Sequence, residues 1–449
     1  MDWRELPQLL ADELVASQEE GRDIDGLRQA VDEWIYRARD VLGQGSALPE
    51  RLRAEGEQLY AAVQGAPRRP DFPYNEPSNL DEIEVLLTPK ARAGTKPVIP
   101  PGLEEKILGG WLGRAAGCLL GKPVEGWTRS RIEAYLRATG VAEIVDYLPR
   151  GEGIPSELTI ALRGACRGEV SGMLRDDDMD YTVTGLMILE RYGPEFTARQ
   201  VGEFWLSHLP YHLVYTAERV AYRNLVDGYV PPQTATRFNP YREWIGAQIR
   251  ADLFGYVAPG APLLAARLAY RDASLSHTGN GIYGEMWVAA SIAAAFTAAT
   301  PREALLAGLA VIPPQSRLAE VIRDCFDWAE GEPDWDHAWR KLEEKYGRYH
   351  PVHTLNNAGL VVLAILFGEQ DLARTVGLAV RGGWDTDCNG ATAGSILGVW
   401  LGASRLPSHL TSPLQDRLET ALAGVRELRF TELAARTGRV ARLIAERYR

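Results

Sequence analysis

A stripe of glycines at every fourth position constrains this chain more than any other feature of its sequence. The four are Gly109, Gly113, Gly117 and Gly121. Residues at this spacing lie along one face of a helix, and each glycine there costs about 1 kcal/mol relative to alanine. A face of glycines is favoured where a second backbone packs closely against it. The sequence therefore predicts a helix over 103–120 that is in direct contact with another element.

The end of this predicted helix places a carboxylate in a short turn. Gly121 and Pro123 terminate the helix, and Glu125 follows at once. A rigid turn of this kind can hold a carboxylate in a binding or catalytic site. A solvated loop glutamate explains the same residues equally well, so the local sequence leaves both interpretations open.

Helical periodicity runs through most of the chain, and strand-like alternation is nearly absent. Three helices are expected in 1–66, and the proline-rich stretches 66–78 and 97–101 cannot be helical. We therefore predict an N-terminal helical extension and linker over 1–98 and a second domain over 99–449. In the second domain the pattern predicts helices over 103–120, 130–139, 179–192, 198–208, 213–226, 240–252, 261–270, 283–298, 302–310, 315–329, 335–346, 353–367, 370–380, 390–402, 413–424 and 431–447. This indicates an all-α fold, an orthogonal multi-helix bundle.

The composition argues against several classes of protein. The net charge of -11 is unfavourable for a nucleic-acid partner, because binding phosphates requires a basic surface. The N-terminal residues are polar from the second onward and the apolar runs are short, so neither a membrane span nor a membrane partner is expected. The four cysteines show no Cys-x-x-Cys spacing, which favours neither a disulfide scaffold nor a zinc site and makes the cytoplasm the expected location. The sequence does not determine the oligomeric state.

An acidic stretch at 176–180 opens a predicted helix. It contains Asp176, Asp177, Asp178 and Asp180. One carboxylate near a helix N-terminus is stabilising by about 0.3–1 kcal/mol, but four repel one another and a cap needs only one. The stretch therefore favours a bound hard cation, which prefers carboxylate oxygen, over a solvated acidic cap.

A second acidic pair, Asp385 and Asp387, lies in a Gly-rich turn before the helix predicted over 390–402. Carboxylates two residues apart on a turn can direct oxygens at one hard cation. They can equally cap the helix that follows. The pair alone does not distinguish these interpretations, and the acidic stretch upstream is what favours a cation site.

A third stretch is rich in glycine. Gly279, Gly281 and Gly284 surround Asn280, a pattern typical of a loop whose backbone approaches a ligand. We therefore predict that Asn280 binds substrate. His277 is a single imidazole nearby, and we expect it to be hydrogen-bonded inside the fold rather than to bind a metal.

Three separated stretches resemble, in order and spacing, the ADP-ribosylglycohydrolase family of the dinitrogenase reductase-activating glycohydrolase type. They are residues 113–125, 176–178 and 383–389. The resemblance covers about residues 103–445 and implies an all-helical fold with a dinuclear site for two divalent cations, Mg²⁺ or Mn²⁺. The residues that it implies are the metal ligands Asp176, Asp177, Asp178, Asp385 and Asp387 and the catalytic Glu125.

Three positions depart from the family's pattern. Cys118 stands where the family usually has aspartate, Cys388 takes the place of a threonine, and Trp384 replaces a glycine directly before Asp385. A tryptophan beside the cations would be well placed to stack on a sugar or a base. We therefore predict a substrate-binding set of Trp384, Cys388, Asn280 and Gly383.

The function that the resemblance implies is metal-dependent hydrolysis of a ribosyl glycosidic bond, with a small-molecule or ADP-ribosylated substrate. A small riboside or nucleoside cleaved on the same fold is the first alternative. The substitutions at Cys118 and Cys388 leave open a ligand-binding member that has lost catalysis. The spacing Asp176-Asp177-x-x-Asp180 also matches the metal motif of isoprenoid-type lyases, but the glycine stripe has no role in such an enzyme.

Overall fold

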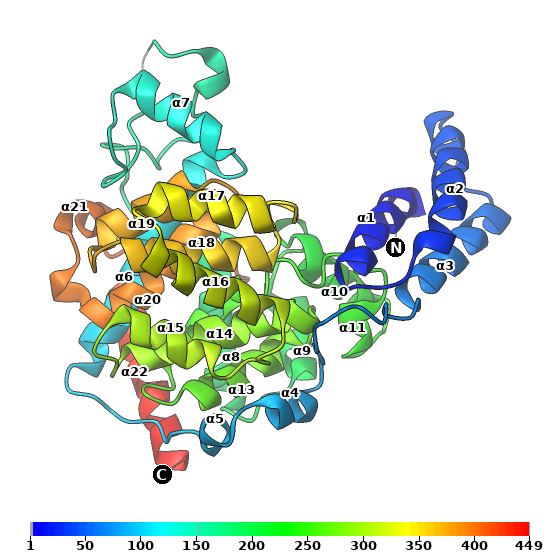
Figure 1. The fold of residues 1–449 in the computed structure, drawn as a ribbon. Helices are drawn as coiled ribbons and strands as arrows, with labels where there is room; N and C mark the ends of the chain where they lie inside the picture. The colour runs from blue at the N-terminus through cyan, green and yellow to red at the C-terminus, as the bar shows by residue number, and fades with distance from the viewer. Residues whose placement is uncertain (1–2, 152, 449) are drawn as a thin grey trace.

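Helices form most of this chain in the computed structural model, which describes residues 3–151 and 153–448 (Figure 1). The N-terminal part contains α1 (Leu6–Glu19), α2 (Asp25–Gly43), α3 (Glu50–Gln64), α4 (Leu80–Leu86) and α5 (Pro89–Ala93). The remaining α-helices are α6 (Leu103–Gly121), α7 (Arg129–Thr139), α8 (Asp177–Tyr192), α9 (Ala198–His208), α10 (Thr216–Val226), α11 (Gln233–Thr236), α12 (Asp252–Tyr256), α13 (Pro262–Ala273), α14 (Gly279–Ala295), α15 (Pro301–Leu309), α16 (Arg317–Gly331), α17 (Trp335–Tyr346), α18 (Thr354–Phe367), α19 (Leu372–Arg381), α20 (Thr386–Leu401), α21 (Ser408–Thr411) and α22 (Phe430–Arg447). Within the described residues, strands are confined to β1 (Leu418–Glu419) and β2 (Glu427–Leu428), which pair antiparallel. The prediction of an all-α fold is confirmed.

Buried apolar side chains gather into two separate clusters. The smaller cluster is formed by α1, α2 and α3 together with Phe238, and the larger one extends from Ile83 to Ile444. The three N-terminal helices stand to one side of the main helical body, next to α10 and α11 (Figure 1). On this basis we propose that residues 1–98 form an extension, whose first three helices have a small core of their own while Ile83 and Leu87 join the larger one, and that residues 99–449 form the main domain.

Buried ion pairs join the extension to the main body. The guanidinium of Arg242 donates to Glu13 at 2.7 Å and to Glu20 at 2.6 Å, and all three side chains are buried. Removing one partner of such a pair leaves an uncompensated buried charge, at a cost of about 3–5 kcal/mol. The extension is therefore docked on the main body through specific contacts.

The close contact predicted for the glycine stripe is made by α20. A Cβ atom added at Gly109, Gly113 or Gly117 would lie between 2.0 and 2.3 Å from a carbonyl oxygen of α20. The glycines that they face are Gly398, Gly394 and Gly390, in that order. The two helices therefore run antiparallel with their backbones in contact, and the C-terminal end of α6 lies against the N-terminal end of α20.

The prediction of a helix over 240–252 is wrong. This segment consists mostly of turns, with only a 3-10 helix at Gln248–Arg250 before α12 begins. Its backbone groups bond to distant parts of the chain, as when the Ile245 N–H donates to Val352 O at 2.9 Å. Such tertiary hydrogen bonds override a helical pattern of apolar residues.

The prediction of a helix over 413–424 is also wrong. The segment forms turns and β1 instead, and Gln415 and Asp416 have φ angles of 50° and 52°. These left-handed conformations interrupt a right-handed helix. The segment pairs with the chain before α8, since the Met173 N–H donates to Arg417 O at 2.8 Å.

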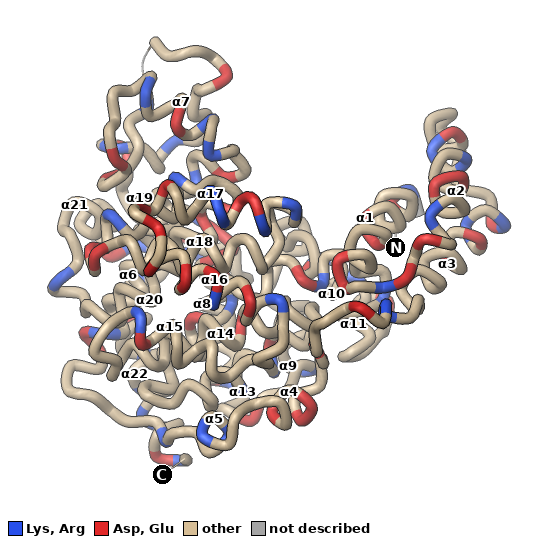
Figure 2. Tube along the Cα trace, in the orientation of Figure 1, with Lys and Arg blue, Asp and Glu red and all other residues tan. Residues whose placement is uncertain are grey.

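Charged residues of both signs are interspersed along α2, α3 and α17 rather than gathered by sign (Figure 2).

Among the described residues, no helix combines the length and the apolar character that a membrane crossing requires.

Candidate metal centre

The glycine contact sets the position relative to α20 of Cys118, on α6, and of Lys122, directly after it. Thr386, in the first turn of α20, donates its Oγ1 hydroxyl to Gly121 O at 2.9 Å, which fixes the alignment of the two helix ends. Cys118 and Lys122 each follow a glycine of the stripe by one position. They therefore point away from the α20 glycines, toward the start of α8.

The acidic stretch caps and opens α8. Asp176 is the N-cap residue, and its Oδ1 accepts from the Asp178 N–H at 3.0 Å. Asp178 lies in the first turn, where Arg114 Nη2 donates to its Oδ1 at 3.0 Å. Arg114 also pairs with Asp252 at 2.8 Å, so this buried guanidinium links the start of α8 to α12.

Asp180 is turned away from the other three aspartates. Its carboxylate pairs with Arg175 at 2.8 Å and accepts from the Ala421 N–H at 3.1 Å. Both contacts are structural, so Asp180 does not belong to the carboxylate group described next.

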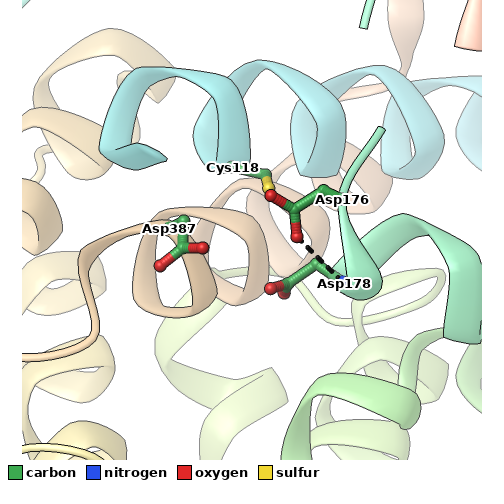
Figure 3. A group of neighbouring side chains, drawn as sticks. All are labelled: Cys118, Asp176, Asp178 and Asp387. Carbon is green, nitrogen blue, oxygen red and sulfur yellow. Dashed lines mark hydrogen bonds between the residues drawn. The ribbon is translucent and has the colours of Figure 1, made fainter. Parts of the chain in front are cut away.

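Carboxylates from segments far apart in the sequence converge at this point (Figure 3). Cys118 Sγ and one oxygen each of Asp176, Asp178 and Asp387 lie within 4.8 Å of one another. A second group with the same spacing is formed by Asp385, Asp387 and Cys388. The two groups share Asp387, so they form one continuous cluster, which we call the carboxylate cluster. Asp177 is half-buried and lies outside both groups.

Asp385 and Asp387 enter the cluster because α20 begins earlier than predicted. The helix starts at Thr386, so Asp385 precedes its first residue and Asp387 lies in its first turn rather than in a Gly-rich turn. The Asp385 N–H donates to Asn357 Oδ1 at 3.3 Å, and Asn389 Nδ2 donates to the same oxygen at 2.7 Å. Asn357, on α18, therefore holds the start of α20 in place.

Burial makes the negative charges of the cluster costly. Asp178 is 1% exposed and Asp387 is 4% exposed. Burial raises the pKa of Asp387 well above its usual value, and the nearby charges of Asp385 and Glu125 raise it further. Burial likewise raises the pKa of Asp178 well above its usual value, although Arg114 opposes the shift. Each of these carboxylates would gain from a nearby cation.

The protein supplies only part of the positive charge. Arg114 pairs with Asp178, and the Lys122 ammonium pairs with Asp176. Among the described residues, the buried Asp385 and Asp387 have no ion-pair partner within 4.0 Å, and neither has the half-buried Asp177. Buried, unpaired carboxylates are rare without a cation or a proton.

The donors present fit a hard divalent cation such as Mg²⁺ or Mn²⁺. Oδ1 of Asp387 is buried and has no hydrogen-bond partner among the described residues, which is the arrangement expected of an oxygen that binds an ion. Carboxylate oxygens are the ligands that such ions prefer. The Cys388 thiol donates to Asp178 Oδ2 at 3.3 Å, and burial raises the thiol's pKa well above its usual value, so this sulfur is a neutral neighbour of the carboxylates.

Glu125 stands at the solvent-facing side of the cluster. It follows a 3-10 turn formed by Lys122–Val124, and its side chain is exposed. Loss of hydration beside the protein, together with the negative charges of Asp385 and Asp176, raises the pKa of Glu125 to about 7, although Lys122 opposes the shift. Glu125 therefore changes protonation near neutral pH.

Trp384 is held in a strained backbone conformation next to the cluster. Its φ of 62° is rare for a bulky residue and is typical of strain stored at functional sites. Its ring is half-buried and lies 6.1 Å from the Trp339 ring, at 30° to it. Gly383 supports this position, because its backbone pairs with Thr128 and a Cβ there would lie 2.7 Å from Arg129 N.

Asn280 lies in a different environment from the one that a ligand-binding loop would give it. The glycines around it begin α14 rather than a loop, so the expectation of a Gly-rich loop is wrong. The side chain is fully buried, with Nδ2 donating to Glu243 at 2.9 Å and Oδ1 accepting from the Leu318 N–H at 3.0 Å. Both ends of the side chain are bound by the protein itself, so the structure does not favour Asn280 as a substrate ligand.

Three residues near the cluster were not predicted from the sequence. Arg114 and Lys122 follow glycines of the stripe at the same spacing, so the helical periodicity could have placed them on the face beside Cys118. Asn357 carries no such signal, because its contacts reach α20 from a separate helix.

Comparisons with known proteins show the family to which this chain belongs. The model of the ADP-ribosylglycohydrolase family matches residues 99–444. Among solved structures, 33 chains match this chain. One of them, described as an ADP-ribosylglycohydrolase-related protein complex, has 20% sequence identity and a TM-score of 0.46, covering 77% of this chain and 99% of that chain. No curated protein matches the sequence.

Proposed function

Because the chain belongs to the ADP-ribosylglycohydrolase family, we propose that it is a metal-dependent hydrolase that cleaves a ribosyl glycosidic bond, with an ADP-ribosyl-type substrate. The observation that carries this proposal is the buried carboxylate cluster, in which Asp387 Oδ1 has no protein partner, directly beside Glu125. The four buried cysteines are unpaired, which suits a reducing compartment, and we propose the cytoplasm as the location.

The cation would be held by carboxylates of the cluster, with Asp385 and Asp387 as the principal ligands and Asp176 and Asp178 beside them. Asp177, which the family resemblance also implies as a ligand, lies outside both donor groups. Two ions, Mg²⁺ or Mn²⁺, are what the family resemblance implies. A divalent cation bound here supplies positive charge that orients hydroxyl groups of the sugar and stabilises charge developing during bond cleavage. Without that charge the carboxylates repel one another and favour their protonated forms.

Glu125 is the proposed acid–base residue. A carboxyl group with a pKa near 7 is present in both protonation states at neutral pH, which is the condition under which proton transfer is most effective. Its neutral form can donate a proton to the leaving group, and its ionised form can accept a proton from the attacking water. The turn from Lys122 to Val124 holds Glu125 on the side of the cluster that solvent and substrate reach.

Trp384 is the proposed stacking residue. Its ring is backed by Trp339, and its backbone is held by a hydrogen bond from the Gly126 N–H to Trp384 O at 3.3 Å. A ring fixed in this way loses little conformational freedom when a flat ligand group stacks on it. The base of an ADP-ribosyl group offers such a flat surface.

The contacts of Asp180 weigh against the isoprenoid-type lyase. That chemistry would require Asp180 to act with Asp176 and Asp177, whereas Asp180 is bound to Arg175 and to the Ala421 backbone. The same contacts make Asp180 a matched control, because it is an acidic residue of the same helical turn that lies outside the cluster.

The proposal is tested by calorimetric titration of ADP-ribose into the protein with Mg²⁺, and again after EDTA treatment. We expect binding that requires Mg²⁺, that is lost in Asp385→Asn and that is retained in Asp180→Asn, with thermal unfolding confirming that both variants fold. Binding that survives EDTA would refute the metal dependence. If ADP-ribose binds under neither condition, a small riboside or nucleoside becomes the proposed substrate. If ADP-ribose binds only with metal but ADP-ribosylated peptides are not turned over, the chain is a ligand-binding member of the family.

A further inference from the structure

A lysine lies within the carboxylate cluster and contacts one of its carboxylates. The Lys122 ammonium pairs with Asp176 Oδ2, and this aspartate is fully buried. The backbone that carries this lysine is held in place, because Gly121 before it packs against the backbone of Thr386 and Pro123 after it restricts the chain. The lysine therefore starts from a defined position, and its ammonium neutralises a buried carboxylate of the cluster.

The two donor groups of the cluster differ in how many oxygens remain available to a cation. In the first group, both oxygens of Asp176 are used, Oδ1 by the Asp178 N–H and Oδ2 by Lys122. Both oxygens of Asp178 are also used, Oδ1 by Arg114 and Oδ2 by the Cys388 thiol. Cys118 contributes sulfur, which is a poor ligand for a hard cation, so the only unpartnered carboxylate oxygen that the described residues offer to this group is Oδ1 of the shared Asp387.

In the second group no carboxylate is held by a protein cation of the described residues, although Asp385 is hydrogen-bonded to Asp387 and Cys388. Asp385 and Asp387 have no ion-pair partner within 4.0 Å among the described residues, and Asp387 Oδ1 has no hydrogen-bond partner there. A divalent cation at this group would neutralise two buried carboxylates and displace no protein cation. A divalent cation at the first group would have to displace Lys122 from Asp176.

We propose that this chain binds one divalent cation, on the side of Asp385 and Asp387, and that the Lys122 ammonium provides the second positive charge by neutralising Asp176. The inference deepens the proposed function and rests on it, since it requires that a divalent cation binds the cluster. It makes Lys122 a positioning residue that keeps Asp176 and the start of α8 in place beside the bound ion. It also accounts for the sulfur of Cys118, because a site filled by an ammonium group needs no further carboxylate.

The test uses the full chain and Mn²⁺ alone, and it measures metal stoichiometry rather than activity. Calorimetric titration and metal analysis after dialysis give the number of Mn²⁺ ions per chain. Electron paramagnetic resonance then distinguishes an isolated Mn²⁺ ion from two ions coupled through a shared carboxylate. We expect the wild-type protein to bind one Mn²⁺ with the spectrum of an isolated ion.

Two variants separate the contribution of Lys122 from that of Cys118. Cys118→Asp adds a hard ligand to the first group but keeps the ammonium, and we expect it still to bind one Mn²⁺. Cys118→Asp combined with Lys122→Met removes the ammonium as well, and we expect two Mn²⁺ ions with a coupled spectrum. Circular dichroism melts establish that each variant is folded before its stoichiometry is compared.

The outcomes distinguish this inference from the proposed function. Two Mn²⁺ ions in the wild type or in Cys118→Asp would overturn the inference and leave the metal-dependent function standing. One ion in the double variant would also overturn it, because removal of the ammonium would then free no position. Absence of Mn²⁺ binding by the wild type would overturn both proposals together.

Discussion

The contact between α6 and α20 can be tested by adding a single methyl group. In Gly113→Ala the new Cβ would lie 2.2 Å from Gly394 O, and a real Cβ is essentially never closer than 3.0 Å to a neighbour. The atom that it meets belongs to the backbone of a buried helix, so no side chain can rotate away. The two helices must separate by about 0.8 Å, the difference between these two distances.

The expected cost follows from two opposing terms. Overpacking a well-packed core costs about 1–3 kcal/mol, and a backbone-to-backbone clash belongs at the upper end, about 3 kcal/mol. The higher helix preference of alanine offsets about 1 kcal/mol of this. The free energy of unfolding of Gly113→Ala should therefore fall by about 2 kcal/mol. The same displacement would move Cys118 and Lys122 away from Asp387.

The assay is equilibrium unfolding in urea, with Gly438→Ala as the matched control. Gly438 lies in the interior of α22, and a Cβ there would meet only flexible side chains, with Glu104 Oε1 at 3.1 Å and Arg442 Nη1 at 3.4 Å. The control should therefore gain up to about 1 kcal/mol. If Gly113→Ala were as stable as the wild type, or as stable as the control, the argument from backbone contact would be refuted.

Three further outcomes are expected. Glu125→Gln should lower kcat by about 10²- to 10⁴-fold and remove the ionisation near pH 7 from the pH–rate profile, and an unchanged profile would exclude Glu125 as the acid–base residue. Trp384→Ala should weaken ADP-ribose binding by about tenfold or more, since stacking on an aromatic ring contributes about 1–3 kcal/mol, whereas Trp328→Ala on α16 should leave the affinity unchanged. The metal-free protein should lose stability as the pH rises from about 4.5 to 7, because carboxyls whose pKa is raised in the folded state, Glu125 and Asp387 among them, bind more protons folded than unfolded. Saturating Mn²⁺ should flatten that fall in the melting temperature, and a metal-free protein that becomes more stable over the same range would contradict the raised pKa values.

The sequence by itself determined the elements that depend on local signals. Helical periodicity and the proline-rich breaks are properties of neighbouring residues, so the all-α class follows from them. The glycine stripe indicated a close backbone contact because glycine is unfavourable in a helix unless something packs there. The residues of the carboxylate cluster were selected from motif resemblance, and the structure brings Asp176, Asp178, Asp385 and Asp387 together.

The tertiary structure alone decided the partners. Nothing in the spacing of Gly113 indicates that it faces Gly394, and nothing near Asn357 indicates that it holds Asp385. Asn280 stood among glycines typical of a ligand loop, yet both ends of its side chain are bound by residues more than thirty positions away along the chain. The predicted helix over 240–252 failed for the same reason, since its backbone bonds to distant segments. Local sequence encodes the preferences of each segment, whereas the free energy of long-range contacts, which can exceed those preferences, depends on which segments meet.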